Sequence, residues 1–237
     1  SSANNKLSTQ MKATGEVMSV GRTIEESLLK AARSLEIGVN HLYMKKFDVF
    51  ADEELLDYIK DGTDDRIYAI AELMRRQADL GMIYDATKID MLFLEKVKNI
   101  IIMERELSEH IGDAGVLYKA KKMGFSDAFI GKLWGKSDEE IYKIREKRYI
   151  FPVYKMIDTC ASEFESYIPY FYSTYEDENE SLVSDKEKIV VLGSGPIRIG
   201  QGVEFDYSTV HAIWSIREAG YEAIIINNNP ETVSTDY

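Results

Sequence analysis

Apolar side chains recur at helical spacing through much of residues 23–150. The clearest case runs from Asp90 to His110. Its apolar stripe is wide and comprises Phe93, Leu94, Val97, Ile100, Ile101, Ile102 and Met103. Because a helix that is apolar over so much of its circumference is usually surrounded by others, we expect this one at the centre of a helical domain.

Capping residues indicate where other helices begin. Thr23 with Glu26, and Ser137 with Glu140, have the spacing of a capping box. In that motif the hydroxyl accepts from the amide three residues on, and the glutamate bonds back to the amide of the capping residue. Together with apolar spacing and glycine stops, these signals predict helices at about 23–37, 52–59, 63–74, 90–110, 114–122, 127–134 and 138–147. Helices this short favour an orthogonal helical domain over a long four-helix bundle.

The pattern changes at Tyr149. Residues 149–175 are rich in aromatic side chains and contain Pro152 and Pro169. Proline favours extended geometry in the residue before it, and so many tyrosines would not be left in water. We therefore expect an extended strap lying on folded surface, followed through Lys188 by an acidic, solvated linker.

An α/β pattern begins at Lys188. The apolar run 189–192 is typical of a buried parallel strand. A helix is predicted from about Phe205 to Ala219, and residues 223–226 form a second strand. This is one β-α-β unit, normally right-handed. Two parallel strands do not complete a domain, so we expect the chain to be an internal piece of a larger enzyme.

A glycine-rich loop containing Gly193, Gly195 and Gly200 follows the first strand. A strand, a glycine loop and a helix are the outline of a dinucleotide site. The third glycine of that fingerprint is replaced here by Arg198, and asparagines stand where an acidic residue should end the second strand. A Rossmann-type oxidoreductase is therefore an alternative that the spacing disfavours. A tight turn, or the wall of another site, fits better.

Three charged residues follow the two strands. Arg198 and Glu204 come after the first strand, and Glu231 comes after the second. The carboxyl ends of parallel strands converge on one crevice in an open sheet. These side chains could line a polar passage or hold an intermediate there. A surface ion pair, worth about 0–1 kcal/mol, is an equal alternative.

Composition narrows the classes of function. The 237 residues carry a net charge of −12, which argues against a nucleic-acid partner and against an anionic membrane surface. No apolar run is long enough to span a bilayer. The single cysteine, Cys160, fits a reducing cytoplasm. The three histidines lack companions at ligand spacing, so no metal site is predicted.

Several segments resemble the large chain of carbamoyl phosphate synthase. VLGSGPIRIGQGVEFDY and NPETVSTDY are similar to the start of its second synthetase half, and LSTQMKATGEVMSVGRTIEESLLKAARSLE is similar to the end of the first. FPVYKMIDTCASEFES and YFYSTYE resemble the strap before the second half. The weakly patterned region 40–148 occupies the position of the family's oligomerisation domain.

The resemblance implies a fold and a domain order. We expect a mainly α chain: an orthogonal helical domain followed by an incomplete α/β (β-α-β), Rossmann-like pre-ATP-grasp segment. The expected parts are the tail of a preceding ATP-grasp domain (1–22), a helical oligomerisation and linking domain (23–150), the strap and acidic linker (151–187), and the first β-α-β of the second half (188–237).

The resemblance also implies a role. The parent enzyme makes carbamoyl phosphate in the cytoplasm, for pyrimidine or arginine synthesis. It uses bicarbonate, ATP with Mg²⁺ or Mn²⁺, and ammonia that a glutaminase small subunit releases from glutamine. Arg198, Gly202, Glu204 and Glu231 match the lining of its internal tunnel. For this chain we expect self-association through the helical domain, and no catalytic residue, cofactor or activity of its own. An interaction module without an enzymatic parent is the alternative.

Overall fold

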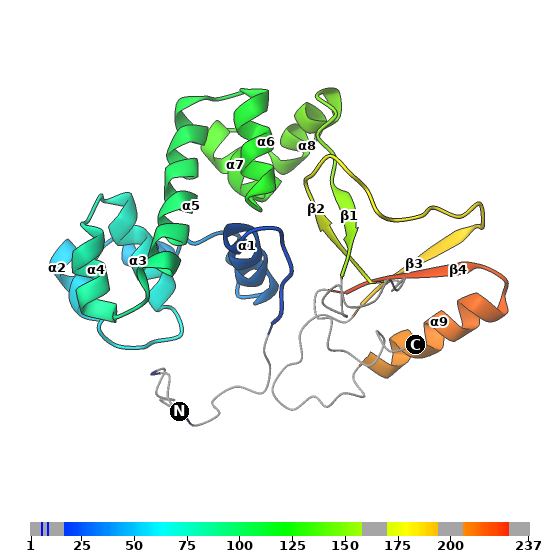
Figure 1. Ribbon diagram of the computed structural model, residues 1–237, viewed down its shortest axis with the longest axis horizontal. Coiled ribbons are helices and arrows are strands. Elements are labelled where there is room, and N and C mark those ends of the chain that lie inside the picture. Colours follow the sequence, from blue (N-terminus) through cyan, green and yellow to red (C-terminus); the bar gives the residue numbers. More distant parts are fainter. Residues whose placement is uncertain (1–5, 7–8, 10–16, 158–169, 194–205, 228–237) are drawn as a thin grey trace.

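The computed structural model describes residues 6, 9, 17–157, 170–193 and 206–227 (Figure 1). Its helical part begins with α1 (Ile24–Ser34), the short 3₁₀ helix η1 (Lys45–Phe47), α2 (Asp52–Tyr58), α3 (Arg66–Arg75) and α4 (Leu80–Thr87). It continues with α5 (Met91–Glu109), α6 (Ala114–Lys122), α7 (Asp127–Trp134) and α8 (Asp138–Lys147). Figure 1 shows α2–α4 at one end of an elongated molecule and a small α/β part at the other.

Helix α5 is the centre of the helical part, as predicted: α1, α3, α4, α6 and α7 all contact it. Its buried stripe is Leu94, Val97, Ile100, Ile101, Met103 and Leu107, each at most 5% exposed. Two residues of the predicted stripe are exposed, Phe93 at 53% and Ile102 at 50%. Ile102 lies nearly opposite the buried stripe at 100° per residue. Phe93 stands in the first turn, at the edge of the core.

The predicted capping box at Ser137 is confirmed in both directions: its hydroxyl accepts from the Glu140 amide, and its amide donates to the Glu140 carboxylate. The box at Thr23 is only half formed. Thr23 accepts from the Glu26 amide at 3.1 Å, but the Glu26 carboxylate accepts from the Arg22 amide at 2.7 Å. The physical reason is that this carboxylate is buried and committed to tertiary partners, described below.

Other helix boundaries differ from the prediction where a backbone feature intervenes. Helix α1 ends at Ser34, before Gly38, because Glu36 takes a left-handed φ of 54°. Helix α3 begins three residues after Thr63, which instead pairs with Lys6 in an isolated bridge. Helix α4 was not predicted. Only one of its side chains is fully buried, so it lacks a clear apolar stripe.

The predicted strap is extended at both described ends. Strands β1 (Val153–Met156) and β2 (Phe171–Thr174) pair antiparallel, with Val153 opposite Thr174. The linker after them is mostly exposed, and two of its residues also bond to β1. The Asn179 side chain accepts from the Tyr154 amide, and the Glu180 amide donates to the Tyr154 carbonyl, each at 2.8 Å. The free edge of β1 supplies backbone groups that need partners.

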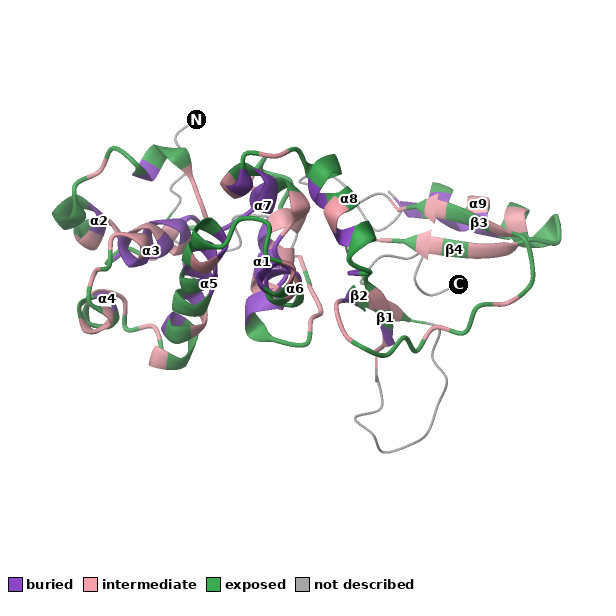
Figure 2. Cartoon of the chain, turned by 90° about the horizontal axis from the view of Figure 1, so that it is seen from above, coloured by how far each residue is buried: buried purple, intermediate pink, exposed green. Residues whose placement is uncertain are grey.

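Strands β3 (Lys188–Leu192) and β4 (Glu222–Ile226) are parallel, and α9 (Tyr207–Glu218) packs against them. The predicted β-α-β elements are therefore present. The prediction of a buried strand is wrong for the described structure: Val190, Leu192 and Ile226 are 51%, 76% and 56% exposed. Helix α9 covers one face of the pair, and Figure 2 shows no described element over the other.

Candidate functional site

Most of the predicted crevice residues lie outside the described part of the chain. Gly195, Arg198, Gly200, Gly202, Glu204 and Glu231 all fall in ranges that the structure does not describe. Their role as a tunnel lining stays a prediction. Gly193 is described.

Gly193 stands where the first loop leaves β3. Its amide donates to the Ile226 carbonyl at 2.7 Å. A Cβ at this position would come within 2.8 Å of the Asn227 side chain, so the close approach of the two chain segments requires glycine. Leu192 and Ile226 are register partners. Both loops thus begin at the carboxyl ends of the two parallel strands. The crevice was predicted from this arrangement.

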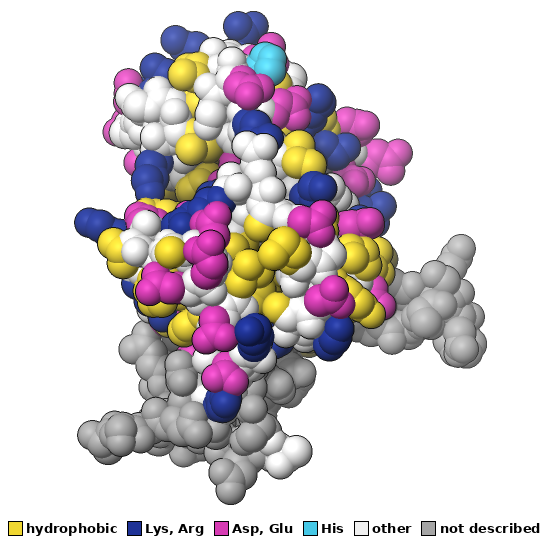
Figure 3. Space-filling model, turned by 90° about the vertical axis from the view of Figure 1, so that its left-hand side faces the viewer, with side chains coloured by type: hydrophobic (Ala, Val, Ile, Leu, Met, Phe, Trp, Pro, Cys, Tyr) yellow, Lys and Arg dark blue, Asp and Glu magenta, His cyan; other side chains and the backbone are white. Residues whose placement is uncertain are grey.

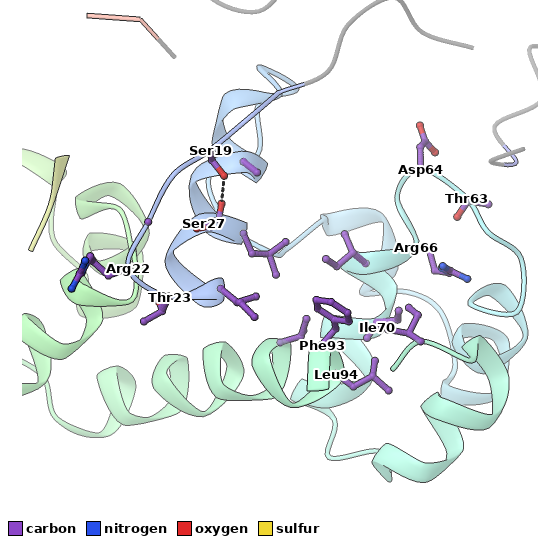
Figure 4. Close-up of a pocket in the computed structure, with 17 residues that line it drawn as sticks. Ser19, Arg22, Thr23, Ser27, Thr63, Asp64, Arg66, Ile70, Phe93 and Leu94 are labelled. Atoms are coloured by element: carbon purple, nitrogen blue, oxygen red, sulfur yellow. Dashed lines mark hydrogen bonds between the residues drawn. The ribbon is translucent and has the colours of Figure 1, made fainter. Parts of the chain in front are cut away.

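The helical part contains an apolar groove of about 750 Å³ between α1, α3 and the start of α5 (Figure 4). Its apolar lining includes Leu28, Ile67, Ile70, Phe93, Leu94 and Val97. Polar side chains, among them Ser19, Arg22, Asp64 and Arg66, stand around it. Ile24 and Phe93 line the groove and remain 40% and 53% exposed. An apolar hollow with a polar rim suits the side chains of a protein partner.

A second hollow of about 510 Å³ is lined by charged groups. Asp127 accepts from Lys121 at 2.8 Å and from two nitrogens of Arg145, at 2.5 Å and 3.0 Å. Burial lowers the pKa of Lys121 to about 8 and raises that of Tyr175 to about 12. The ammonium and the guanidinium also face the Tyr175 ring. The charged groups of this cluster are paired with one another, so none of them is available as a free acid or base. The cluster instead joins α6, α7 and α8 to the residue after β2.

Two further features of the described residues concern metal ions and membrane-spanning helices. Within the described ranges, no group of three or more His, Cys, Asp or Glu side chains is placed to hold a metal ion. Among the helices that the structure describes, none is long and apolar enough to cross a membrane.

These features define a helical domain followed by a β-α-β unit. Residues 16–149 match the family model of the carbamoyl-phosphate synthetase large chain, oligomerisation domain. Residues 185–237 match the carbamoyl phosphate synthase pre-ATP-grasp domain. The first match spans more than half of the chain, so the chain belongs to the carbamoyl-phosphate synthetase large-chain family.

The two matches confirm the resemblance and the fold class predicted from the sequence, and they identify a connecting segment of the synthase. All the predicted loop and crevice residues fall within the second match. Sequence reasoning missed the groove. Its lining comes from three helices far apart in the chain, and no local motif marks it.

Proposed function

We propose that this segment joins the two halves of the synthase and brings copies of the large chain together through its helical part. The chemistry is that of the parent ligase, which forms carbamoyl phosphate in the cytoplasm for pyrimidine or arginine synthesis. ATP with Mg²⁺ or Mn²⁺ binds to other parts of that enzyme, and a glutaminase small subunit supplies ammonia. The isolated segment is inactive. Bicarbonate-dependent ATP hydrolysis by the isolated chain would refute this last statement.

The observation that carries the association proposal is the groove between α1, α3 and α5. It lies wholly within the match to the oligomerisation domain. We propose that a second copy of this chain occupies the groove. On the face formed around α2–α4, apolar side chains alternate with groups of both charge signs, and neither sign dominates (Figure 3). Such a mixed surface fits a neutral protein contact better than a nucleic acid or an anionic lipid.

A stable dimer buries about 800 Å² on each partner, so the contact must extend beyond the groove itself. Exposed apolar side chains adjoin it in sequence. Leu92, next to Phe93 at the start of α5, is 51% exposed. Phe93 is the anchor of the proposed contact, because large aromatic side chains at the centre of an interface contribute most of its affinity.

Two substitutions on α5 test the groove. Phe93→Glu places a charge in the groove, whereas Ile102→Glu places the same charge on an equally exposed side chain nearly opposite the buried stripe. Sedimentation velocity should show self-association weakened at least about tenfold in Phe93→Glu, since an unpaired buried charge costs more than 1.4 kcal/mol. Ile102→Glu should behave like the wild type. Far-ultraviolet circular dichroism checks that both variants fold.

The opposite pattern, with dissociation of Ile102→Glu only, would place the contact on the other side of α5 and refute the groove. If both variants self-associated as strongly as the wild type, the groove would also be refuted as the contact surface. In that case another part of the synthase, rather than a second copy, covers the groove.

We also propose that Arg198, Gly202, Glu204 and Glu231 line the passage used by an intermediate. The parallel pairing of β3 and β4 supports this, because the two loops start at adjacent carboxyl ends of these strands. In the complete synthase, Gly202→Leu should obstruct such a passage. Carbamoyl phosphate formation should then fall by tenfold or more while ATP hydrolysis continues. A parallel fall in both rates would count against a passage and favour a structural role for the loop.

A further inference from the structure

Lys30 on α1 joins two segments that are far apart in the sequence. Its ammonium donates to the carbonyl of Val20 at 2.9 Å and to the carbonyl of Ser173 at 2.6 Å. The third contact is with Glu26, one turn earlier on the same helix, at 2.8 Å. An ammonium has three protons to donate, and here each has an acceptor. Lys30 thus ties the leading segment, residues 17–22, to strand β2.

Glu26 repeats this connection with its other carboxylate oxygen. That oxygen accepts from the Arg22 amide at 2.7 Å and from the Thr174 hydroxyl at 3.1 Å. The Glu26 side chain is only 1% exposed, so its charge relies on these partners for stabilisation. Arg22 adds a link at the surface, where its Nε lies 3.2 Å from the Glu176 carboxylate.

Helix α1, which carries this pair, packs tightly against the turn between α6 and α7. Gly124, in the turn between α6 and α7, is packed so closely on α1 that a Cβ there would lie 3.0 Å from the Glu26 Cα. Arg33, also on α1, donates to the Gly124 carbonyl at 2.7 Å. The Glu26–Lys30 pair therefore cannot follow the leading segment or β2 without moving α1 against the rest of the helical part.

We infer that Glu26 and Lys30 form a clamp that holds the leading segment and β2 in one fixed relation. Both are positioning residues. In a connecting segment, these two stretches lead out of the helical part in opposite chain directions, so the clamp aligns what lies on either side and transmits a displacement from one side to the other. This inference rests on the proposed connecting function and adds to it the side chains that do the coupling.

The test is amide hydrogen exchange on the intact chain. Thr174→Val removes only the hydroxyl on the β2 side and keeps the shape of the side chain. If the clamp couples both sides, exchange at the Arg22 amide should rise at least about threefold, although no group of the leading segment has been changed. Lys30→Met should raise exchange both in residues 17–22 and in β2.

Ser34→Ala is the matched control, because among the described residues the Ser34 hydroxyl bonds only to the Lys30 carbonyl within α1. It should leave exchange unchanged on both sides. The clamp is overturned if Thr174→Val alters exchange in β2 alone, or in neither segment. Amides of α5 report in every variant whether the helical part is folded, and Thr174→Val carries the test if Lys30→Met does not fold.

Light scattering on the same samples separates this inference from the association proposal. A failed clamp leaves the mass of the chain unchanged. Because Arg22 also stands at the rim of the groove, its exchange is compared with and without Thr174→Val in the Phe93→Glu background, where association is lost and a change at Arg22 reports the clamp alone.

Discussion

Arg75 on α3 and Glu104 on α5 form a two-pronged ion pair, with Nε–Oε2 at 2.7 Å and Nη2–Oε1 at 2.8 Å. Nη2 also donates to the Leu42 carbonyl at 2.5 Å. Burial by itself would raise the pKa of Glu104, but the hydrogen bonds from Arg75 and His41 bring it below its ordinary value. One guanidinium therefore holds three parts of the helical domain together.

Arg75→Lys should destabilise the chain by about 1–3 kcal/mol. A lysine ammonium cannot reproduce the planar fork that reaches both oxygens of Glu104 and the Leu42 carbonyl. Urea unfolding monitored by circular dichroism measures the change. Arg105→Lys, at an exposed position on α5, is the control and should stay within about 0.5 kcal/mol of the wild type. Equal midpoints for the two variants would show that the fork contributes nothing.

His41 lies against the same carboxylate. Its Nε2 is 2.7 Å from Glu104, and its ring stacks on Phe129 with centroids 3.7 Å apart. Its Nδ1 is buried and has no hydrogen-bond partner in the described part of the chain. Burial, reinforced by the positive charges of Arg75 and Arg33, lowers the pKa of His41, although the bond to Glu104 opposes the shift. A neutral ring donating from Nε2 fits this site.

The free energy of unfolding should therefore decrease as the pH falls below about 6.5, the ordinary value for histidine. The unfolded chain takes up a proton there that the folded chain resists, so the stability from neutral His41 is complete above pH 6.5 and is lost below it. The slope should approach 1.4 kcal/mol per pH unit, roughly the value for one proton. Urea unfolding at intervals between pH 8 and pH 5 measures it.

His41→Gln should flatten that dependence, whereas His110→Gln, at the exposed end of α5, should retain it. Below pH 5 Glu104 adds a second loss of stability, because its own pKa is lowered in the folded state. A wild-type chain whose stability rose between pH 6.5 and pH 5 would contradict the assignment of a buried neutral ring.

Gly124→Ala should destabilise the chain more than Gly112→Ala does. Both glycines have left-handed φ angles, +88° and +83°, so alanine costs about 1–2 kcal/mol at each from backbone strain. At Gly124 the added Cβ would also press on the backbone of Glu26, whereas no atom of the described residues lies within 4 Å of a Cβ at Gly112. Thermal unfolding of the two variants isolates this contact. If both variants lost the same stability, α1 would be able to shift away from the added Cβ at little energetic cost.

The sequence predicted the helices of the second half of the helical domain to the residue, because side chains set their limits. Asp113 and Ser126 accept from amides in the first turns of α6 and α7, and Ser137 begins α8 with a complete capping box. Where the backbone or tertiary contacts set the limit, the prediction failed. The early end of α1 at Glu36 is one example, and the half-formed box at Thr23 is another.

The sequence predicted the crevice but neither the clamp nor the groove, for a physical reason. The crevice was inferred from charged residues after two strands, a local signal, yet those residues lie outside the described structure. The clamp gave no such signal, because Lys30 bonds to backbone carbonyls of Val20 and Ser173 that any residue would supply. The groove likewise depends on how three helices meet.

The central claim is that the helical part associates with a second copy, and light scattering across a range of concentrations tests it most directly. A chain ending at Asp185, which lacks the exposed strand face, should give the same association state as the intact chain, so that face is excluded as the cause. The mass of the intact chain should rise with concentration to at least twice the 27.1 kDa of one chain. A mass of 27.1 kDa at every concentration would contradict it.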